Sequence, residues 1–165
     1  MTESDLHTAV DLVQLAVEHG VTIGTAESLT GGSLAAAIVD VPGASNCLEG
    51  GVVSYSHAVK ERTLGVSHDL LESEGAVAPE VARAMARGAR AALEVDWAVS
   101  TTGVAGPDPH DGQAVGTVYI AVSGPRGEQH LELHMDGGRA AIRSETVSRA
   151  IEFLASQIEL TDNFQ

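Results

Sequence analysis

The sequence predicts an α/β protein, a three-layer α/β/α sandwich around a mixed sheet. Segments with helical and strand patterns alternate along the 165 residues, and two apolar strands each run into a polar turn that contains glycine. A late hairpin adds antiparallel strands, which makes the sheet mixed rather than wholly parallel. The length suits one domain of about 100 to 200 residues, and we expect residues 1–165 to form it.

The first quarter of the chain predicts a helix, a strand, a polar turn and a second helix. The first helix covers residues 5–19 and ends at Gly20, because apolar side chains recur at helical spacing. Its predicted buried stripe consists of Leu6, Val10, Val13 and Val17. Residues 21–26 form a short buried strand, and after the turn at 27–32 residues 33–39 are helical by propensity.

The middle of the chain predicts a β-rich stretch, two helices and a second buried strand. Residues 48–56 are β-rich, a short polar helix covers the region of Lys60, and Pro79 begins a longer helix at its N1 position. The solvated side of that helix consists of Glu80, Arg83, Arg87, Arg90 and Glu94. From Trp97 an apolar strand again runs into Thr and Gly residues, which end at Pro107.

The last third of the chain predicts a polar loop, a hairpin and a closing helix. Residues 108–115 are polar and are expected to be mobile, and residues 117–122 and 129–135 alternate as the two strands of a hairpin. The closing helix starts at about residue 138. Its predicted buried stripe consists of Val147, Ile151, Leu154 and Ile158.

The composition excludes several classes of function. Nine Lys and Arg residues stand against 23 Asp and Glu residues, a net charge of −14, and only five residues are aromatic. Such a protein repels nucleic acids and anionic lipids and has no row of rings for base stacking. We therefore expect no nucleic-acid partner, no membrane partner and, without a basic signal-peptide region, a cytoplasmic location. The single cysteine, Cys47, is expected to be a small buried hydrophobe.

The basic residues are almost all arginine, and Lys60 is the only lysine. Many carboxylates with almost no lysine suit a high-salt cytosol, where self-repulsion is screened. We expect activity to rise in molar salt, and full activity in dilute buffer would contradict this. A retained lysine suggests a role that Arg cannot fill, because Lys can lose its proton. The other interpretation is that Lys60 is a surface lysine without a special role.

The turn after the first strand offers a hydroxyl at Ser28 and a flexible backbone at Gly31 and Gly32, just before a helix. Free N–H groups and the helix dipole there favour an anion such as a phosphate or an oxyanion. Neither the P-loop ending nor the Gly-x-Gly-x-x-Gly spacing is present, so the turn predicts no nucleoside triphosphate or dinucleotide. An ordinary turn in which Ser28 or Thr30 caps the helix remains an equal alternative.

A second polar group places Tyr55, His57 and Lys60 within six residues. A serine nucleophile needs a neighbour that accepts its proton, and a desolvated lysine can be that neighbour. If Lys60 points at the first turn, Ser–Lys chemistry with Ser28 is possible. His57 is the competing base, but we interpret it as a solvated side chain in a polar segment.

Two further groups of polar residues are candidate ligand sites. Arg139 and Arg143 are four residues apart at the start of a helix, so they share a face and suit a carboxylate or phosphate. Surface salt bridges are the alternative for this pair. His130, Glu132 and His134 share one face of a strand and could chelate a metal, but a half-buried strand already explains their alternation.

Four stretches of the chain, in this order, match motifs of a known family. They are residues 25–32 (TAESLTGG), 53–56 (VSYS) with Lys60, 75–77 (GAV) and 102–107 (TGVAGP). In these motifs the chain resembles the C-terminal domain family of the competence/damage-inducible protein CinA, and the likeness covers nearly the whole chain. Leu29 stands where many members have Cys, and residues 108–112 and Ala114 also depart from the family pattern.

The resemblance implies an α/β/α fold, a homodimer and a nicotinamide-nucleotide amidase. The implied reaction converts nicotinamide mononucleotide to nicotinate mononucleotide and ammonia without a metal or a cofactor. Ser28, Lys60 and Tyr55 match the family's nucleophile and its activating partners. The implied substrate contacts are Glu27, Thr30, Gly31, Gly32, Thr102, Gly103, Gly106, Arg139 and Arg143.

The residues and the resemblance together predict one mechanism. Neutral Lys60, with Tyr55 as a relay, takes the proton of Ser28, which attacks the amide carbon. Backbone N–H groups near Gly31 and Gly32, or near Thr102 and Gly103, stabilise the oxyanion. Two alternatives stay open, a non-catalytic nucleotide-binding or partner-binding domain and an amidohydrolase for another small amide. Binding of nicotinamide mononucleotide without ammonia release would favour the first.

Overall fold

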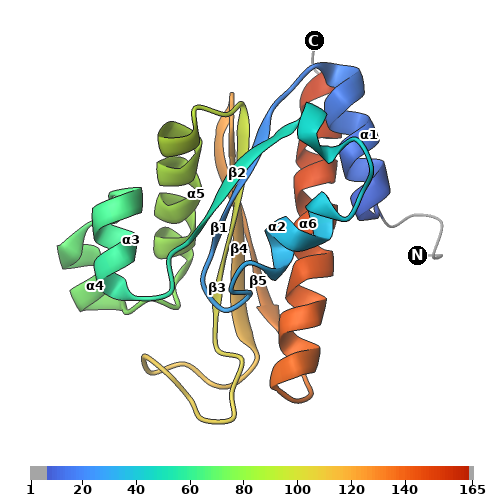
Figure 1. The fold of residues 1–165 in the computed structure, drawn as a ribbon. Helices are drawn as coiled ribbons and strands as arrows, with labels where there is room; N and C mark the ends of the chain where they lie inside the picture. The colour runs from blue at the N-terminus through green and yellow to red at the C-terminus, as the bar shows by residue number, and fades with distance from the viewer. Residues whose placement is uncertain (1–6, 164–165) are drawn as a thin grey trace.

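A five-stranded mixed sheet forms the centre of the molecule, in the order β2-β1-β3-β4-β5 (Figure 1). The computed structural model describes residues 7–163. β1 pairs in parallel with β2 and β3, and β4 pairs antiparallel with both β3 and β5. The strands are β1 (Ile23–Glu27), β2 (Leu48–Val53), β3 (Trp97–Gly103), β4 (Thr117–Gly124) and β5 (Gly127–His134). The predicted mixed sheet and its late hairpin are confirmed.

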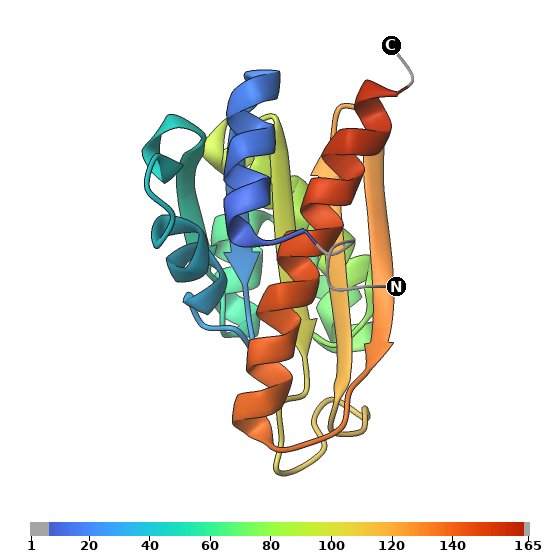
Figure 2. The same cartoon turned by 90° about the vertical axis from the view of Figure 1, so that its right-hand side faces the viewer.

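Helices cover both faces of this sheet, which confirms the three-layer sandwich (Figures 1 and 2). One face carries α1 (Ala9–His19), α2 (Ser33–Val39) and α6 (Arg139–Asp162), and the other carries α3 (His57–Leu64), α4 (His68–Glu74) and α5 (Pro79–Leu93). A 3₁₀ turn, η2 (Ala44–Asn46), precedes β2. The buried Cys47 belongs to the core beneath α1, α2 and α6. Within residues 7–163 no helix is long and apolar enough to cross a membrane.

The first helix differs from its prediction in both its start and its buried face. It begins at Ala9, because Thr8 and Asp11 form a capping box there. Its buried side chains are Leu12, Val13 and Ala16. Val10 and Val17 are 48% and 46% exposed. The predicted burial is therefore wrong for two of the three stripe residues that the structure describes, and the fourth, Leu6, lies outside the described residues. The small Ala16 belongs to the contact face, which a count of large apolar residues misses.

The helices on the other face bring Lys60 close to the sheet. Pro79 starts α5 at N1 as predicted, and the helix packs an Ala-rich face on β3 and β4. Gly88 of α5 allows the close approach of α3, because a Cβ there would collide with the Leu64 carbonyl. The α4 helix was not predicted from the sequence, and Leu71 is its only buried residue.

The carboxyl ends of three parallel strands meet at one edge of the sheet. β1 is the middle strand of the three, with β2 on one side and β3 on the other. The chain therefore moves outward to β2 and then returns across β1 to β3, which is a topological switch point. Ligand sites of open α/β sheets lie at such an edge.

Candidate active site

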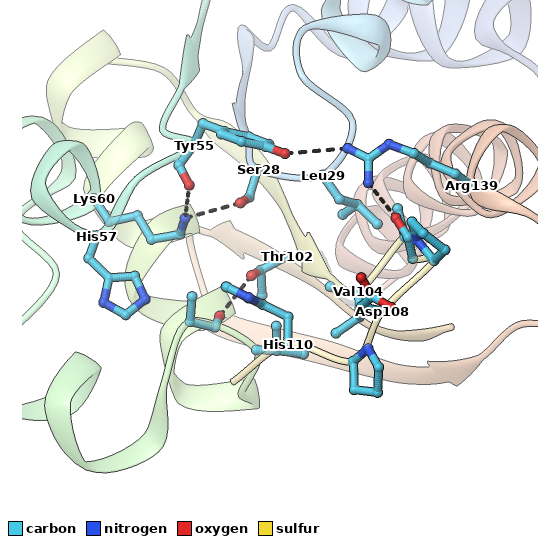
Figure 3. A pocket seen from close by; sticks show the side chains of 17 residues that line it. Ser28, Leu29, Tyr55, His57, Lys60, Thr102, Val104, Asp108, His110 and Arg139 are labelled. Carbon is cyan, nitrogen blue, oxygen red and sulfur yellow. Dashed lines mark hydrogen bonds between the residues drawn. The ribbon is translucent and has the colours of Figure 1, made fainter. Parts of the chain in front are cut away.

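A pocket of about 320 Å³ lies at this edge of the sheet (Figure 3). Its wall is formed by the turn after β1, the start of α3, the end of β3 with the loop that follows, and the start of α6. Of the residues predicted for the site, Ser28, Tyr55, Lys60, Thr102, Gly103, Gly106 and Arg139 line it. The switch point therefore brings together side chains from across the sequence.

Lys60 is fully buried, and its amine lies among three oxygen atoms (Figure 3). Nζ donates to Ser28 Oγ at 3.0 Å, to the Ser54 carbonyl at 2.7 Å and to the Tyr55 carbonyl at 3.2 Å. Burial lowers the pKa of Lys60 from 10.5 to about 8, and the Asp111 carboxylate acts in the opposite direction. An amine with such a pKa can accept a proton near neutral pH, so the pair can activate the serine hydroxyl.

The nucleophile candidate is held by the turn that follows β1. The Ser28 N–H donates to the Thr101 carbonyl at 3.0 Å, which continues the pairing of β1 with β3. Gly31 and Gly32 then take φ values of 57° and 101°, a backbone that glycine adopts without strain. The turn therefore closes tightly, and Ser28 Oγ is left at the pocket wall.

The predicted anion site at the start of α2 is already filled by Glu27. This carboxylate is 1% exposed and accepts the N–H groups of Gly32, Leu34 and Ala35 at 3.2, 2.8 and 3.1 Å. The Gly31 N–H donates to the Ser28 carbonyl. These partners leave the turn no N–H at Gly31 or Gly32 for an oxyanion, so this expectation is wrong.

The predicted capping alternative is also wrong, because neither hydroxyl caps α2. The N-cap residue is Gly32, and Glu27 supplies the acceptor. The Thr30 hydroxyl shares a 2.8 Å hydrogen bond with Thr101 and is fully buried. Glu27, Thr30, Gly31 and Gly32 therefore shape the turn from behind and do not line the pocket.

The two arginines on α6 have separate tasks. Arg143 donates to the carbonyls of Leu29 and Thr30 at 2.8 and 3.1 Å, which braces the serine turn. It does not line the pocket, so the structure does not bring both predicted arginines to the pocket wall. Arg139 alone reaches the pocket wall, where it donates to the Gly106 carbonyl at 2.7 Å.

Tyr55 is not placed to relay protons to Lys60. Its side chain is 63% exposed, and its hydroxyl accepts from Arg139 at 3.4 Å, while only its backbone carbonyl contacts the lysine. Figure 3 shows the phenol ring with its hydroxyl directed toward Arg139. The residue instead supplies a hydroxyl beside the guanidinium group.

The remaining predicted wall residues come from β3 and its loop. The Thr102 hydroxyl donates to the Ala76 carbonyl at 2.7 Å, so it ties β3 to the segment before α5. Gly106 has a φ of 91°, and a Cβ there would collide with Val115. The loop needs glycine at this position to turn back toward β4.

The sequence interpretation gave no site role to His57, which lines the pocket, or to Asp111, which contacts it from outside the lining. The His57 side chain is 41% exposed, which fits the expectation of a solvated side chain, but it also lines the pocket, and its Nε2 lies 3.3 Å from Asp111 Oδ2. Asp111 belongs to the loop expected to be mobile, yet its carboxylate accepts the Ala76 N–H at 2.8 Å. The signal for His57 was its spacing of three from Lys60 on a helix, which places both on one face.

The proposed metal face of β5 does not hold a cluster. His130 accepts the Arg83 Nε–H at 2.9 Å, and His134 pairs with Glu132 at 3.0 Å. Among the described residues 7–163 no group of three or more His, Cys, Asp or Glu side chains could hold a metal ion.

Comparison with known proteins places this chain in a family. The family model of the CinA C-terminal domain matches residues 5–158. A CinA-like protein of Frankia casuarinae is 44% identical over 140 residues, which are 85% of this chain and 32% of that protein. This chain thus spans about a third of the length of that relative.

Solved structures show the same likeness. A CinA superfamily protein of Klebsiella pneumoniae aligns with a TM-score of 0.88 at 27% identity, over 92% of this chain and 95% of that one. The competence/damage inducible protein CihA of Agrobacterium tumefaciens aligns with a TM-score of 0.83 at 33% identity, over 94% and 98%. The chain belongs to the CinA C-terminal domain family.

Proposed function

We propose that this chain hydrolyses the carboxamide of nicotinamide mononucleotide to nicotinate mononucleotide and ammonia. The observation that carries the proposal is the fully buried Lys60 amine in hydrogen-bond contact with Ser28 Oγ. Burying an amine is costly unless it is well hydrogen-bonded. Two of the three oxygen atoms around Lys60 Nζ are backbone carbonyls, and the third is the Ser28 hydroxyl on the pocket wall. This arrangement is typical of an activated serine nucleophile.

The two carbonyls beside Lys60 orient it as a base. When the amine is neutral, its two N–H groups donate to the carbonyls of Ser54 and Tyr55, and its lone pair faces the Ser28 hydroxyl. A base with a pKa of about 8 is neutral in about a tenth of molecules at pH 7. Activity should therefore rise between pH 6 and pH 9.

The proton balance of the reaction closes on these two residues. Lys60 takes the hydroxyl proton as Ser28 Oγ bonds to the amide carbon, and the carbonyl π electrons move to oxygen. The Lys60 ammonium then gives this proton to the amide nitrogen, the oxyanion electrons re-form the carbonyl as the C–N bond breaks, and ammonia leaves. Water adds to the acyl carbon as Lys60 takes one of its protons, the bond between the acyl carbon and Ser28 Oγ breaks as the carbonyl re-forms, and Lys60 returns the proton to Ser28 Oγ, which releases the acid.

The phosphate of the substrate requires positive charge on the pocket wall. Arg139 supplies a guanidinium group there, and the Tyr55 hydroxyl lies beside it at 3.4 Å. A guanidinium group can donate two parallel hydrogen bonds to a phosphate. Arg139 and Tyr55 are thus assigned to the phosphate and not to the chemical step. The predicted homodimer stays a prediction.

Ammonia and nicotinate mononucleotide are the products to measure, with purified protein and nicotinamide mononucleotide in low and high salt. The Ser28→Ala variant is expected to lose at least about a thousandfold in turnover.

Ser54→Ala is the matched control, because it removes a neighbouring buried hydroxyl but keeps the carbonyl that holds Lys60. Equal ammonia release from wild type and Ser28→Ala would refute the mechanism. Binding without release from the folded wild type would favour a binding domain.

A further inference from the structure

Asp111 is a carboxylate held against three residues of the pocket wall, Ala76, His57 and His110. Its Oδ2 accepts the Ala76 N–H at 2.8 Å and lies 3.3 Å from His57 Nε2 and 3.6 Å from His110 Nε2. These contacts hold the Asp111 side chain at 22% exposure and lower the pKa of its carboxyl, chiefly through the Ala76 N–H. The group is therefore ionised throughout the neutral range.

The backbone of Asp111 adds a second, independent observation. Its φ is 48°, in the left-handed region that few residues other than glycine adopt. Gly75 lies directly beneath the side chain, and a Cβ there would lie 2.8 Å from Asp111 Cβ. The segments on both sides thus take special conformations that bring this carboxylate against the start of α3.

The carboxylate contacts a residue of α3 that shares a helix face with the Lys60 amine. His57 and Lys60 are three residues apart on that helix, so their side chains share a face. Figure 3 shows the His57 ring beside Lys60 at the pocket wall. Asp111 contacts this ring, and its negative charge opposes the effect of burial on the Lys60 pKa.

We propose that Asp111 is a positioning residue whose carboxylate stabilises the ammonium form of Lys60 and so sets the pH range in which Lys60 acts as a base. This proposal rests on the role given to Lys60 above. A lysine without Asp111 would be neutral more often at pH 7, but it would also be a weaker base when it takes the serine proton. The carboxylate thus keeps Lys60 a stronger base while a useful fraction of it is still neutral at pH 7.

The other charged groups around Lys60 do not replace this carboxylate. Besides Lys60, the titratable side chains that line the pocket are Tyr55, His57, Asp108, His110 and Arg139, and of these only Asp108 is a carboxylate. The α5 helix packs on α3, but its arginines point to the hairpin side, since Arg83 contacts His130, Arg87 contacts Glu128 and Arg90 contacts Gly124. Glu61 of α3 pairs with His68 of α4.

The sequence makes a direct test possible, because Lys60 is its only lysine. Protein labelled with ¹³C and ¹⁵N lysine gives one side-chain signal, which can be titrated by NMR in the absence of substrate. In Asp111→Asn the Lys60 pKa is expected to fall by about half a unit or more. Asparagine tolerates a left-handed backbone, and its amide oxygen can still accept the Ala76 N–H.

Two variants separate charge from structure. Asp111→Gly adopts the backbone without strain and is expected to shift the Lys60 pKa in the same direction. Asp162→Asn is the matched control, because it removes an equal carboxylate, also paired with a histidine, at the far end of α6. A Lys60 pKa that moves by less than about 0.2 units in both Asp111 variants, or equally in Asp162→Asn, would overturn the proposal.

Turnover provides the second readout. The acid limb of the kcat/KM profile for ammonia release should move to lower pH in Asp111→Asn by the same amount as the NMR titration. A purely structural role would lower the plateau and leave this midpoint in place. The NMR titration needs no turnover, so a Lys60 shift without ammonia release would support the electrostatic role and refute the proposed reaction.

Discussion

Lys60→Met is expected to abolish ammonia release and, in the same molecule, to raise the free energy of unfolding. The pKa of Lys60 is about 8 in the folded protein, against 10.5 for an ordinary lysine, which we take for the unfolded chain. Below pH 8 the buried ammonium therefore lowers the free energy of unfolding by about 3 kcal/mol. Methionine has similar length and no charge. It leaves two carbonyls without their donor, at about 1 kcal/mol each, so we expect a net gain of about 1 kcal/mol at pH 6.

The sign of this effect depends on pH in a defined way. The folded pKa lies below the unfolded one, so the wild type gains stability as pH rises from about 8 to 10.5. The variant lacks this gain, and its advantage should shrink over that range. Urea unfolding at pH 6 and pH 9 measures this, with Arg62→Met as the control because that cation on the same helix is exposed. A less stable Lys60→Met at pH 6 would show that the amine contributes to folding.

Glu27→Gln is expected to cost about 3 kcal/mol of stability and most of the activity. The carboxylate is buried and accepts three backbone N–H groups at the start of α2, including those of Leu34 and Ala35. A glutamine keeps one acceptor oxygen but places an NH₂ group against the same donors. The helix start also loses a negative charge that its dipole favours. Because Ser28 follows directly, the serine hydroxyl should leave its position beside Lys60.

Thermal unfolding and ammonia release together test this second expectation. Glu18→Gln is the matched control, since that glutamate of α1 is exposed. Its midpoint of unfolding should stay at the wild-type value. If Glu27→Gln were as stable as the control, the N–H groups of α2 would have found other acceptors. Full activity in Glu27→Gln would mean that the turn positions Ser28 without this carboxylate.

The sequence predicted the layers of the fold because apolar periodicity reports which side of an element is buried. It also selected Lys60, through composition rather than pattern, since a single lysine among eight arginines is conspicuous. The buried face of α1 was wrong because a small residue, Ala16, packs where the pattern counted valines. Helix α4 was missed because only Leu71 of it is buried.

The details of the site depend on contacts that periodicity does not report. Glu27 and Arg143 were predicted to bind substrate, but each satisfies backbone groups of the serine turn, in the case of Arg143 from more than 100 residues away. Asp111 reaches Ala76 across 35 residues of sequence. A polar side chain in a glycine-rich loop has the same appearance in the sequence whether it binds a ligand or the protein's own backbone.

The two backbone carbonyls that hold the Lys60 amine affect which positions of the sequence can be substituted without losing this contact. Ser54 and Tyr55 contribute main-chain atoms to this contact, and those atoms persist whatever side chain the positions carry. Evolution can therefore replace both residues and keep the amine aimed at the hydroxyl, provided that the strand ends where it does. In the proposed mechanism the side chains at positions 28 and 60 are themselves the reacting groups, so a homologue that lacks either one would keep the shape of the site without that chemistry.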